Sequence, residues 1–219
     1  MRRLPANLGR GFVGVFSGSN VVPLTVGASA TVGAAALDTD VRDAVGDPAS
    51  SFGKNISSAG GVTTSIVVTG LFVGGRFAHG TRFRAMTYDL LDAMVVNAAY
   101  TAVLKLATQR ERPDASNKHS FPSGHTSNMF TLATVVERHY GWKLGAPAYV
   151  LAGVVGYGRL VQDKHWLSDV AAGATLGYIV GRTVVRVNGR PLDKGQKTTW
   201  NISPIAGRDA RGMLLSVSF

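Results

Sequence analysis

Six segments rich in apolar and small residues run through the chain, and they restrict its fold more than any other feature of the sequence. Gly and Ala are frequent within them, as in helices that pack closely inside a membrane. Several are shorter or more polar than the roughly 20 apolar residues that a membrane span needs. The pattern predicts an all-α bundle of about six helices, with segments at about residues 21–37, 61–77, 85–104, 126–136, 144–160 and 170–185.

The composition limits the class of protein and its partners. The 219 residues suffice for one domain with a sizeable core. Hydrophobic residues make up 45% and charged residues only 16%, which is charge-poor for a soluble protein. The formal net charge of +10 favours an anionic partner, such as a phosphate ester or an acidic membrane surface. No basic run interleaved with aromatic residues is visible, so nucleic acid is not expected as a partner. The lack of cysteine excludes disulfides and thiolate metal sites.

The C-terminal tail differs in pattern from the helical segments. Met213, Leu215 and Val217 alternate with smaller or polar neighbours, which is the periodicity of a strand. Residues 207–212 are a candidate hairpin loop. We therefore expect a helical domain over residues 1–197, followed by a short accessory β-hairpin over residues 198–219.

One candidate binding loop precedes the fourth apolar segment. Pro122 and Gly124 indicate a turn, and a helix is expected to begin there. Backbone N–H groups at Ser123 and Gly124 then point outward without a partner in the helix, and together with the helix dipole they favour an anion. His125 adds a group that can give or take a proton near neutral pH. This loop combines anion donors with an acid–base residue.

Two further groups of polar residues flank this loop in the sequence. Lys105 and Arg112 are seven residues apart, so they share one helix face, and Pro113 ends the helix there. Farther along, His165 and Asp169 are four residues apart, one helical turn. A carboxylate at that spacing can hold one imidazole nitrogen and leave the other free to react. Each group alone is more often an ordinary surface feature; their occurrence in this order favours one shared site.

The pattern K-x6-R-P, then P-S-G-H, then R-x5-H-x3-D resembles the type-2 phosphatidic acid phosphatase and vanadium haloperoxidase superfamily. The third motif begins at Arg159. Two features depart from the family pattern. Gly158 stands where the family often has Ser, which removes one hydroxyl donor but no charge. Only residues 114–121 separate the first two motifs, which leaves little room for a segment that covers the substrate.

The resemblance implies a phosphohistidine mechanism that needs no metal cofactor. His165 is then the nucleophile, Asp169 orients it, and His125 protonates the leaving group. The expected phosphate-binding residues are Lys105, Arg112, Ser123, Gly124 and Arg159. The remaining histidines, His79, His119 and His139, have no partner at a useful spacing and are expected at the surface or in loops.

The distribution of charge predicts how such a chain sits in a membrane. With Arg2 and Arg3 inside, the acidic residues 38–54 fall outside, and the later basic loops fall inside except for the motif loops. All three motifs then lie on one side. This favours a multi-pass protein of the cell membrane with an extracytoplasmic active site. A periplasmic soluble or peripheral bundle is the alternative.

Three functions remain open at this point. The first is a phosphatase for lipid phosphates or diphosphates, of the phosphatidic acid or polyprenyl diphosphate type. The second is a vanadate-dependent haloperoxidase or a soluble non-specific acid phosphatase, which use the same anion cradle. The third, from another class, is a non-catalytic anion-binding membrane protein; the full set of His125, His165 and Asp169 argues against it.

Overall fold

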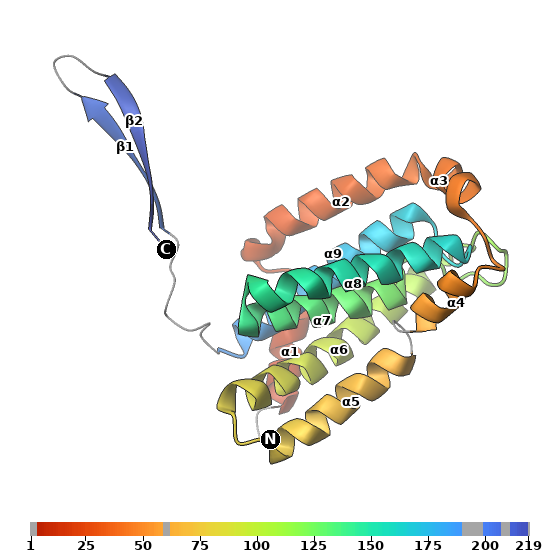
Figure 1. The fold of residues 1–219 in the computed structure, drawn as a ribbon, viewed down its shortest axis with the longest axis horizontal. Helices are drawn as coiled ribbons and strands as arrows, with labels where there is room; N and C mark the ends of the chain where they lie inside the picture. The colour runs from red at the N-terminus through yellow and green to blue at the C-terminus, as the bar shows by residue number, and fades with distance from the viewer. Residues whose placement is uncertain (1–3, 59–61, 190–198, 207–210, 219) are drawn as a thin grey trace.

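A computed structural model describes residues 4–58, 62–189, 199–206 and 211–218 of the chain. Within these ranges, nine α-helices and one short 3-10 helix precede two strands (Figure 1). The elements are α1 (Leu4–Gly14), η1 (Gly18–Asn20), α2 (Val21–Ala35), α3 (Asp38–Val45), α4 (Ser51–Ser58), α5 (Val62–Phe77), α6 (Thr81–Thr108), α7 (Gly124–Tyr140), α8 (Trp142–Val161), α9 (Leu167–Val187), β1 (Thr199–Ala206) and β2 (Arg211–Ser218).

The helical class agrees with the prediction, but about six helices is too few. The six predicted apolar segments correspond to α2 and α5–α9. The additional helices in the described residues are α1, α3 and α4. Of these, α3 and α4 are only eight residues long and mostly polar, so they lack the extended apolar pattern by which a longer helix is recognised.

Helix α7 forms the middle of the bundle and packs against α6, α8 and α9. Its last residue is followed by Gly141, whose φ of +78° favours glycine and separates α7 from α8. The main core lies between α6, α7 and α9 and includes the fully buried side chains of Leu90, Val96, Val135 and Val180. A second cluster joins α7 to α8. The position of α7 therefore fixes the helices that carry all three motifs.

Three glycines on α9 allow this helix to approach α7 closely. Gly173, Gly177 and Gly181 recur every four residues and so lie on one face of α9. A Cβ at Gly173 would lie 2.5 Å from the carbonyl oxygen of Ser123, and one at Gly177 would lie 2.3 Å from that of Ser127. Small residues at this spacing allow two backbones to come together, as in membrane helix pairs. This contact brings the start of α7 against the first turns of α9.

Several helices are suited to a membrane. In the described residues, α6, α8 and α9 are each long and apolar enough to span one, and α1 with η1–α2, bent by 53°, would make a fourth span. Large apolar side chains such as Val22, Val26 and Val32 on α2 and Val150 on α8 are exposed on the outside of the bundle. The chain is therefore a membrane protein with three or four candidate spans. Helices α5 and α7, with 16 and 17 residues, are shorter than the roughly 20 residues that a membrane span needs.

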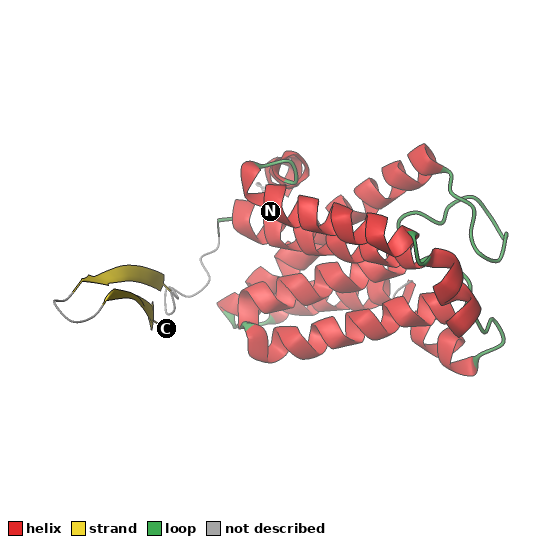
Figure 2. Cartoon of the chain, turned by 90° about the horizontal axis from the view of Figure 1, so that it is seen from above, coloured by secondary structure: helices red, strands yellow, loops and turns green. Residues whose placement is uncertain are grey.

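Residues 199–206 and 211–218 are described as two antiparallel strands, with Thr199 opposite Ser218 and Ala206 opposite Arg211. Figures 1 and 2 both show this strand pair apart from the helices. The division into a helical domain over residues 1–197 and a hairpin tail over residues 198–219 stays a prediction, and residues 190–198 lie outside the described ranges.

Candidate active site

The three motifs lie at one end of the bundle because four helix ends meet there. Helices α6 and α8 end at this side, and α7 and α9 begin at it, beside α3 (Figure 1). Hydrogen bonds join the motif segments directly. The Ser123 N–H donates to the carbonyl oxygen of Asp169 over 2.9 Å, and the Asp114 N–H donates to that of Asp163 over 3.1 Å. The Lys105 ammonium donates to the carbonyl oxygen of His119. Segments distant in sequence thus form one site.

The structure brings together His165, two residues before α9, and Asp169 on the first turn of that helix. The Nδ1 atom of His165 lies 3.6 Å from Oδ2 of Asp169, and both side chains are buried. No hydrogen-bond partner of His165 Nδ1 is found among the described residues. The carboxylate therefore faces Nδ1, and the second ring nitrogen, Nε2, is the one left for chemistry.

The basic side chains of Lys105, Arg112 and Arg159 lie near the motif histidine His125. Arg159 is only 6% exposed, and its Nη1 donates to Oε1 of Gln162 over 2.8 Å. In the part of the chain that the structure describes, the buried Nε atoms of Arg112 and Arg159 have no hydrogen-bond partner. Buried donors without a partner cost free energy. A group of cations with such donors is suited to a multiply charged oxyanion.

The charges of this group act on both motif histidines. Burial, together with the nearby cations Arg159, Arg112 and Lys105, lowers the pKa of His125 from 6.5 to about 3. The pKa of His165 is lowered to about 4 by burial and by Arg159 and Lys105, although the carboxylate of Asp169 opposes this shift. Both imidazoles are therefore neutral near pH 7 in this structure. Because all three cations act on His125, they lie near the same imidazole.

Ser123 and Gly124 differ in what they can offer an anion. Ser123 is fully buried and caps α7, because its Oγ accepts a hydrogen bond from the Thr126 N–H over 3.5 Å and another from the Thr126 hydroxyl over 2.9 Å. Its N–H is used by Asp169, so only its hydroxyl hydrogen is left to donate. Gly124 is partly exposed, and a Cβ there would meet Thr101 only at an ordinary 3.5 Å. The protein itself thus leaves space beside Gly124 for another group to approach its backbone.

Sequence reasoning missed three residues that hold Asp169. Arg110, Ser120 and Asp38 form a hydrogen-bonded group with this carboxylate, as described below. Arg110 lies inside the first motif, but nothing in its spacing distinguishes it from the motif cations. Asp38 belongs to an acidic stretch that charge distribution alone places in an outer loop. Contacts between residues so far apart in sequence leave no local pattern.

The three remaining histidines have different surroundings. His79 and His119 are exposed, as expected. His139 is not a surface residue: it is 7% exposed, and its Nε2 lies 2.9 Å from Oδ2 of Asp89. Asp89 lies fifty residues away in sequence, which is why spacing did not reveal the pair. Within the described ranges, no group of three or more His, Asp or Glu side chains is placed to hold a metal ion.

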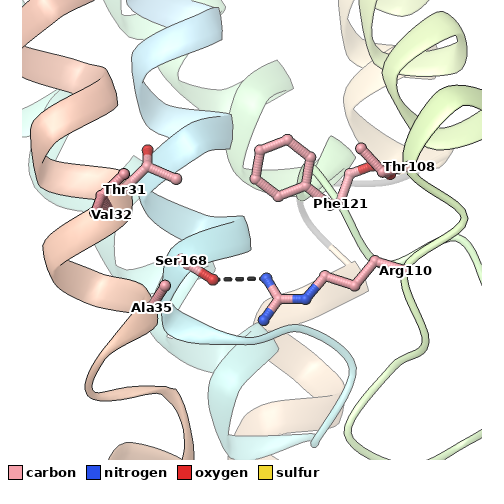
Figure 3. Close-up of a pocket in the computed structure, with 7 residues that line it drawn as sticks. All are labelled: Thr31, Val32, Ala35, Thr108, Arg110, Phe121 and Ser168. Carbon is pink, nitrogen blue, oxygen red and sulfur yellow. Dashed lines mark hydrogen bonds between the residues drawn. The ribbon is translucent and has the colours of Figure 1, made fainter.

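An open cavity of about 410 Å³ lies beside the site, between α2 and the motif loops. Its lining is mainly apolar (Figure 3). Thr31, Val32 and Ala35 line it from α2, and Thr108, Arg110, Phe121 and Ser168 line it from the motif side. Figure 3 shows the Arg110 guanidinium at its edge, directed toward Ser168.

Residues 87–191, which contain all three motifs, match the sequence model of the PAP2 superfamily. Two curated relatives overlap this region. A lipid A 1-phosphatase from Porphyromonas gingivalis is 39% identical over 80 residues, which is 35% of this chain and 18% of that protein. A decaprenylphosphoryl-5-phosphoribose phosphatase from Mycobacterium tuberculosis is 31% identical over 100 residues, which is 42% of this chain and 55% of that protein. The chain thus spans about half or less of the length of these relatives.

Two solved structures share the fold. The first is a transmembrane PAP2 type phosphatidylglycerolphosphate phosphatase from Bacillus subtilis, with a TM-score of 0.64 and 21% identity, covering 80% of this chain and 98% of that one. The second is Aquifex aeolicus LpxE, with a TM-score of 0.57 and 22% identity, covering 68% and 95%. Residues 87–191 are thus a PAP2 superfamily region, and the resemblance drawn from the three motifs within it is confirmed.

Proposed function

We propose that this chain is a membrane phosphatase that hydrolyses lipid phosphate or diphosphate esters through a phosphohistidine intermediate, without a metal ion. The observation that carries the proposal is the gathering of Lys105, Arg112 and Arg159 near His125, with Lys105 and Arg159 also near His165. The relatives from P. gingivalis and M. tuberculosis, which are named as phosphatases of lipid substrates, support it. The exposed apolar faces of α2 and α8 beside a cationic site suit a substrate with a charged head and an apolar tail.

In the first step, Nε2 of His165 attacks phosphorus and the bond from phosphorus to the leaving oxygen breaks. His125 supplies the proton that this oxygen needs. Asp169 faces Nδ1 of His165, so it stabilises the positive charge that the ring gains when the N–P bond forms. In the second step, His125 takes a proton from water, the water oxygen attacks phosphorus, and the N–P bond breaks. Inorganic phosphate leaves and His165 is restored.

Charge stabilisation supplies most of the catalysis in such a reaction, because phosphoryl transfer needs alignment and neutralisation more than new bonding groups. Lys105, Arg112 and Arg159 would hold the non-bridging oxygens, and the two guanidinium groups can do so with two donors each. The Gly124 N–H and the Ser123 hydroxyl would complete the cradle. A dianionic phosphoryl group also offsets the cations that disfavour protonated His125, so substrate binding itself prepares the general acid.

The site is proposed to face the extracytoplasmic side of the cell membrane. The charges that support this orientation include Arg138 in the last turn of α7 and Lys143 in the first turn of α8, at the end of the bundle opposite the motifs. A lipid phosphate lying in that leaflet could then reach the cations with its head group while its chains remain between the helices and the lipid.

The test uses the full chain, purified in detergent, with phosphatidic acid, a polyprenyl diphosphate and a soluble aryl phosphate, each with and without chelator. We expect a lipid substrate to be hydrolysed with or without chelator. His165→Ala should reduce the rate by at least about 10³-fold, as loss of a nucleophile does. His79→Ala, which removes an exposed histidine at the opposite end, serves as the matched control. A phosphoenzyme trapped by acid-free quenching should be present in the parent and absent from His165→Ala.

The alternatives give different outcomes in the same experiment. Bromide oxidation with added vanadate and peroxide, without ester hydrolysis, would indicate a haloperoxidase. Hydrolysis of the aryl phosphate alone would indicate a non-specific acid phosphatase. Phosphate binding that is unaffected by His165→Ala, with no turnover in the parent, would indicate an anion-binding protein without catalysis.

A further inference from the structure

The Asp169 carboxylate is held by more groups than the histidine that it faces. Its Oδ1 accepts a hydrogen bond from Nη1 of Arg110 over 2.8 Å. Its Oδ2 accepts one from the Trp166 N–H over 2.9 Å and another from the Ser120 hydroxyl. The carboxylate is fully buried, so its orientation is set by these donors. Arg110 is the only charged donor among them.

Arg110 connects Asp169 to a second buried carboxylate. Its Nη2 donates to Oδ2 of Asp38 over 2.7 Å, while Nη1 also donates to the Ser168 hydroxyl over 2.6 Å. Asp38 begins α3 and is 6% exposed. It also accepts hydrogen bonds from the Ser168 N–H and hydroxyl, over 2.8 and 2.7 Å. A residue outside the family-matched region 87–191 is therefore joined through one guanidinium to the predicted catalytic pair.

We propose that Arg110 and Asp38 are positioning residues that fix the Asp169 carboxylate against His165. The guanidinium is planar and holds its donors in a rigid fork, so two carboxylates bound to it cannot rotate independently. Both of its terminal nitrogens are used by carboxylates, so Arg110 differs in role from the motif cations assigned to phosphate. The proposal rests on the proposed function, because it concerns the same histidine.

Arg110 is not needed to attach α3 to the start of α9. Asp38 already joins α3 to the start of α9 through its two hydrogen bonds with Ser168. What Arg110 adds is a charged contact with Asp169 itself, on the oxygen that does not face His165. Its loss should therefore alter the reaction more than the attachment of α3.

The cavity beside α2 allows an experiment to separate a positioning role of Arg110 from a purely structural one. The Arg110 side chain is 32% exposed and lines the cavity of about 410 Å³ (Figure 3). Truncation of Arg110 would open the guanidinium position to small molecules from that side. Methylguanidinium at millimolar concentration is then a probe that can replace the lost group without restoring the peptide connection.

The experiment compares parent, Arg110→Ala, Asp38→Asn and the control Asp40→Asn, an exposed aspartate on the same helix. All are assayed as full chains in detergent with a lipid phosphate that the parent hydrolyses. We expect Arg110→Ala to lower kcat by about 100-fold, as a misplaced reacting group does, with KM nearly unchanged. Asp38→Asn should lower kcat by about 10-fold, and methylguanidinium should raise the kcat of Arg110→Ala by at least about 10-fold. Asp40→Asn should match the parent.

Failure of this proposal differs from failure of the proposed function. A parent without phosphatase activity rejects the function. An active parent with parent-like kcat in folded Arg110→Ala, or with Asp38→Asn equal to Asp40→Asn, overturns the positioning role. So does a folded Arg110→Ala protein that loses activity and that methylguanidinium does not reactivate. If Arg110→Ala does not fold, the comparison of Asp38→Asn with Asp40→Asn decides alone.

Discussion

Two buried polar clusters occupy the two ends of the same helices. They differ in whether their charged and polar groups find partners within the protein. The first is the motif end, with Lys105, Arg112 and Arg159 around His125 and His165. The second, the distal cluster, consists of Asp89, Asp92, His139 and Asn188. Asp89 lies about 24 Å along α6 from Lys105, at about 1.5 Å per residue.

The distal cluster is largely satisfied within the protein. Asp89 is fully buried; its Oδ2 pairs with His139, and its Oδ1 accepts a hydrogen bond from the Asn188 amide over 2.7 Å. The same amide nitrogen is 3.2 Å from Oδ2 of Asp92. The cluster joins α6, α7 and the residue after α9. Its carboxylates meet donors from neighbouring helices, so it stabilises the packing of the bundle.

The motif end has the opposite balance. Its cations lie close enough together to lower the pKa of His125 jointly, and buried nitrogen atoms of Arg112, Arg159 and His165 lack partners in the described residues. Like charges in proximity destabilise the fold. Functional sites typically hold like charges and buried titratable groups together, although this arrangement lowers the stability of the fold. The contrast predicts that substitutions at the two ends will separate activity from stability.

Among substitutions that compare the two ends and leave the catalytic histidines in place, the largest effect is expected for Arg159→Met at the motif end. Removal of one charge-stabilising donor should lower kcat/KM by about 10²–10³-fold. The melting temperature should stay the same or rise, because an apolar side chain of similar length replaces a buried cation that repels its neighbours. The measurements are kcat/KM on a lipid phosphate and thermal unfolding in detergent. Arg76→Met, at an exposed position on α5, is the control. A clear fall in melting temperature with activity retained would contradict the prediction that the motif end serves activity and not stability.

The next effect is expected for Asp89→Ala in the distal cluster. The substitution removes the acceptor of the His139 ring, at a cost of about 1–3 kcal/mol of unfolding free energy for a buried group. The Asn188 amide loses its shorter hydrogen bond and keeps the one to Asp92. The kcat of the folded fraction should match the parent, because the cluster is far from the reacting groups. Denaturant unfolding and active-site titration measure the two quantities, with exposed Asp43→Ala as control. A lower kcat with unchanged stability would place Asp89 in the catalytic machinery.

The predictability of these two ends from sequence differs for a physical reason. The motif residues were identified because each set falls within one helical turn or two, where spacing fixes which side chains share a face. Helices α6–α9 were found for the same reason, since apolar runs are local. Asp38 and Arg110 are 72 residues apart, and His139 and Asp89 are 50 apart, so only the packing of the helices brings them together. Short polar helices such as α3 gave no signal of their own.

The smallest effect concerns the protonation of the motif histidines. With pKa values lowered to about 3 for His125 and about 4 for His165, neither ring should titrate between pH 5 and 8 without an anion. In unfolded chains both titrate near 6.5, so their contribution to stability is complete above that pH. It is lost as the pH falls from about 6.5 through the folded-state pKa values of about 4 and about 3, because the unfolded state then binds more protons.

A bound oxyanion should reverse part of this shift. Orthovanadate or phosphate adds negative charge beside the cations, and we expect the pKa of His125 to rise by at least about one unit, equivalent to about 1.4 kcal/mol. NMR of ring-labelled histidine, assigned with the His165→Ala variant, measures it, and exposed His79 reports any general change. A His125 ring that titrates near its ordinary pKa without anion would show that the motif cations do not act together on it. The motif end would then no longer differ from the distal cluster in the repulsion between its cations.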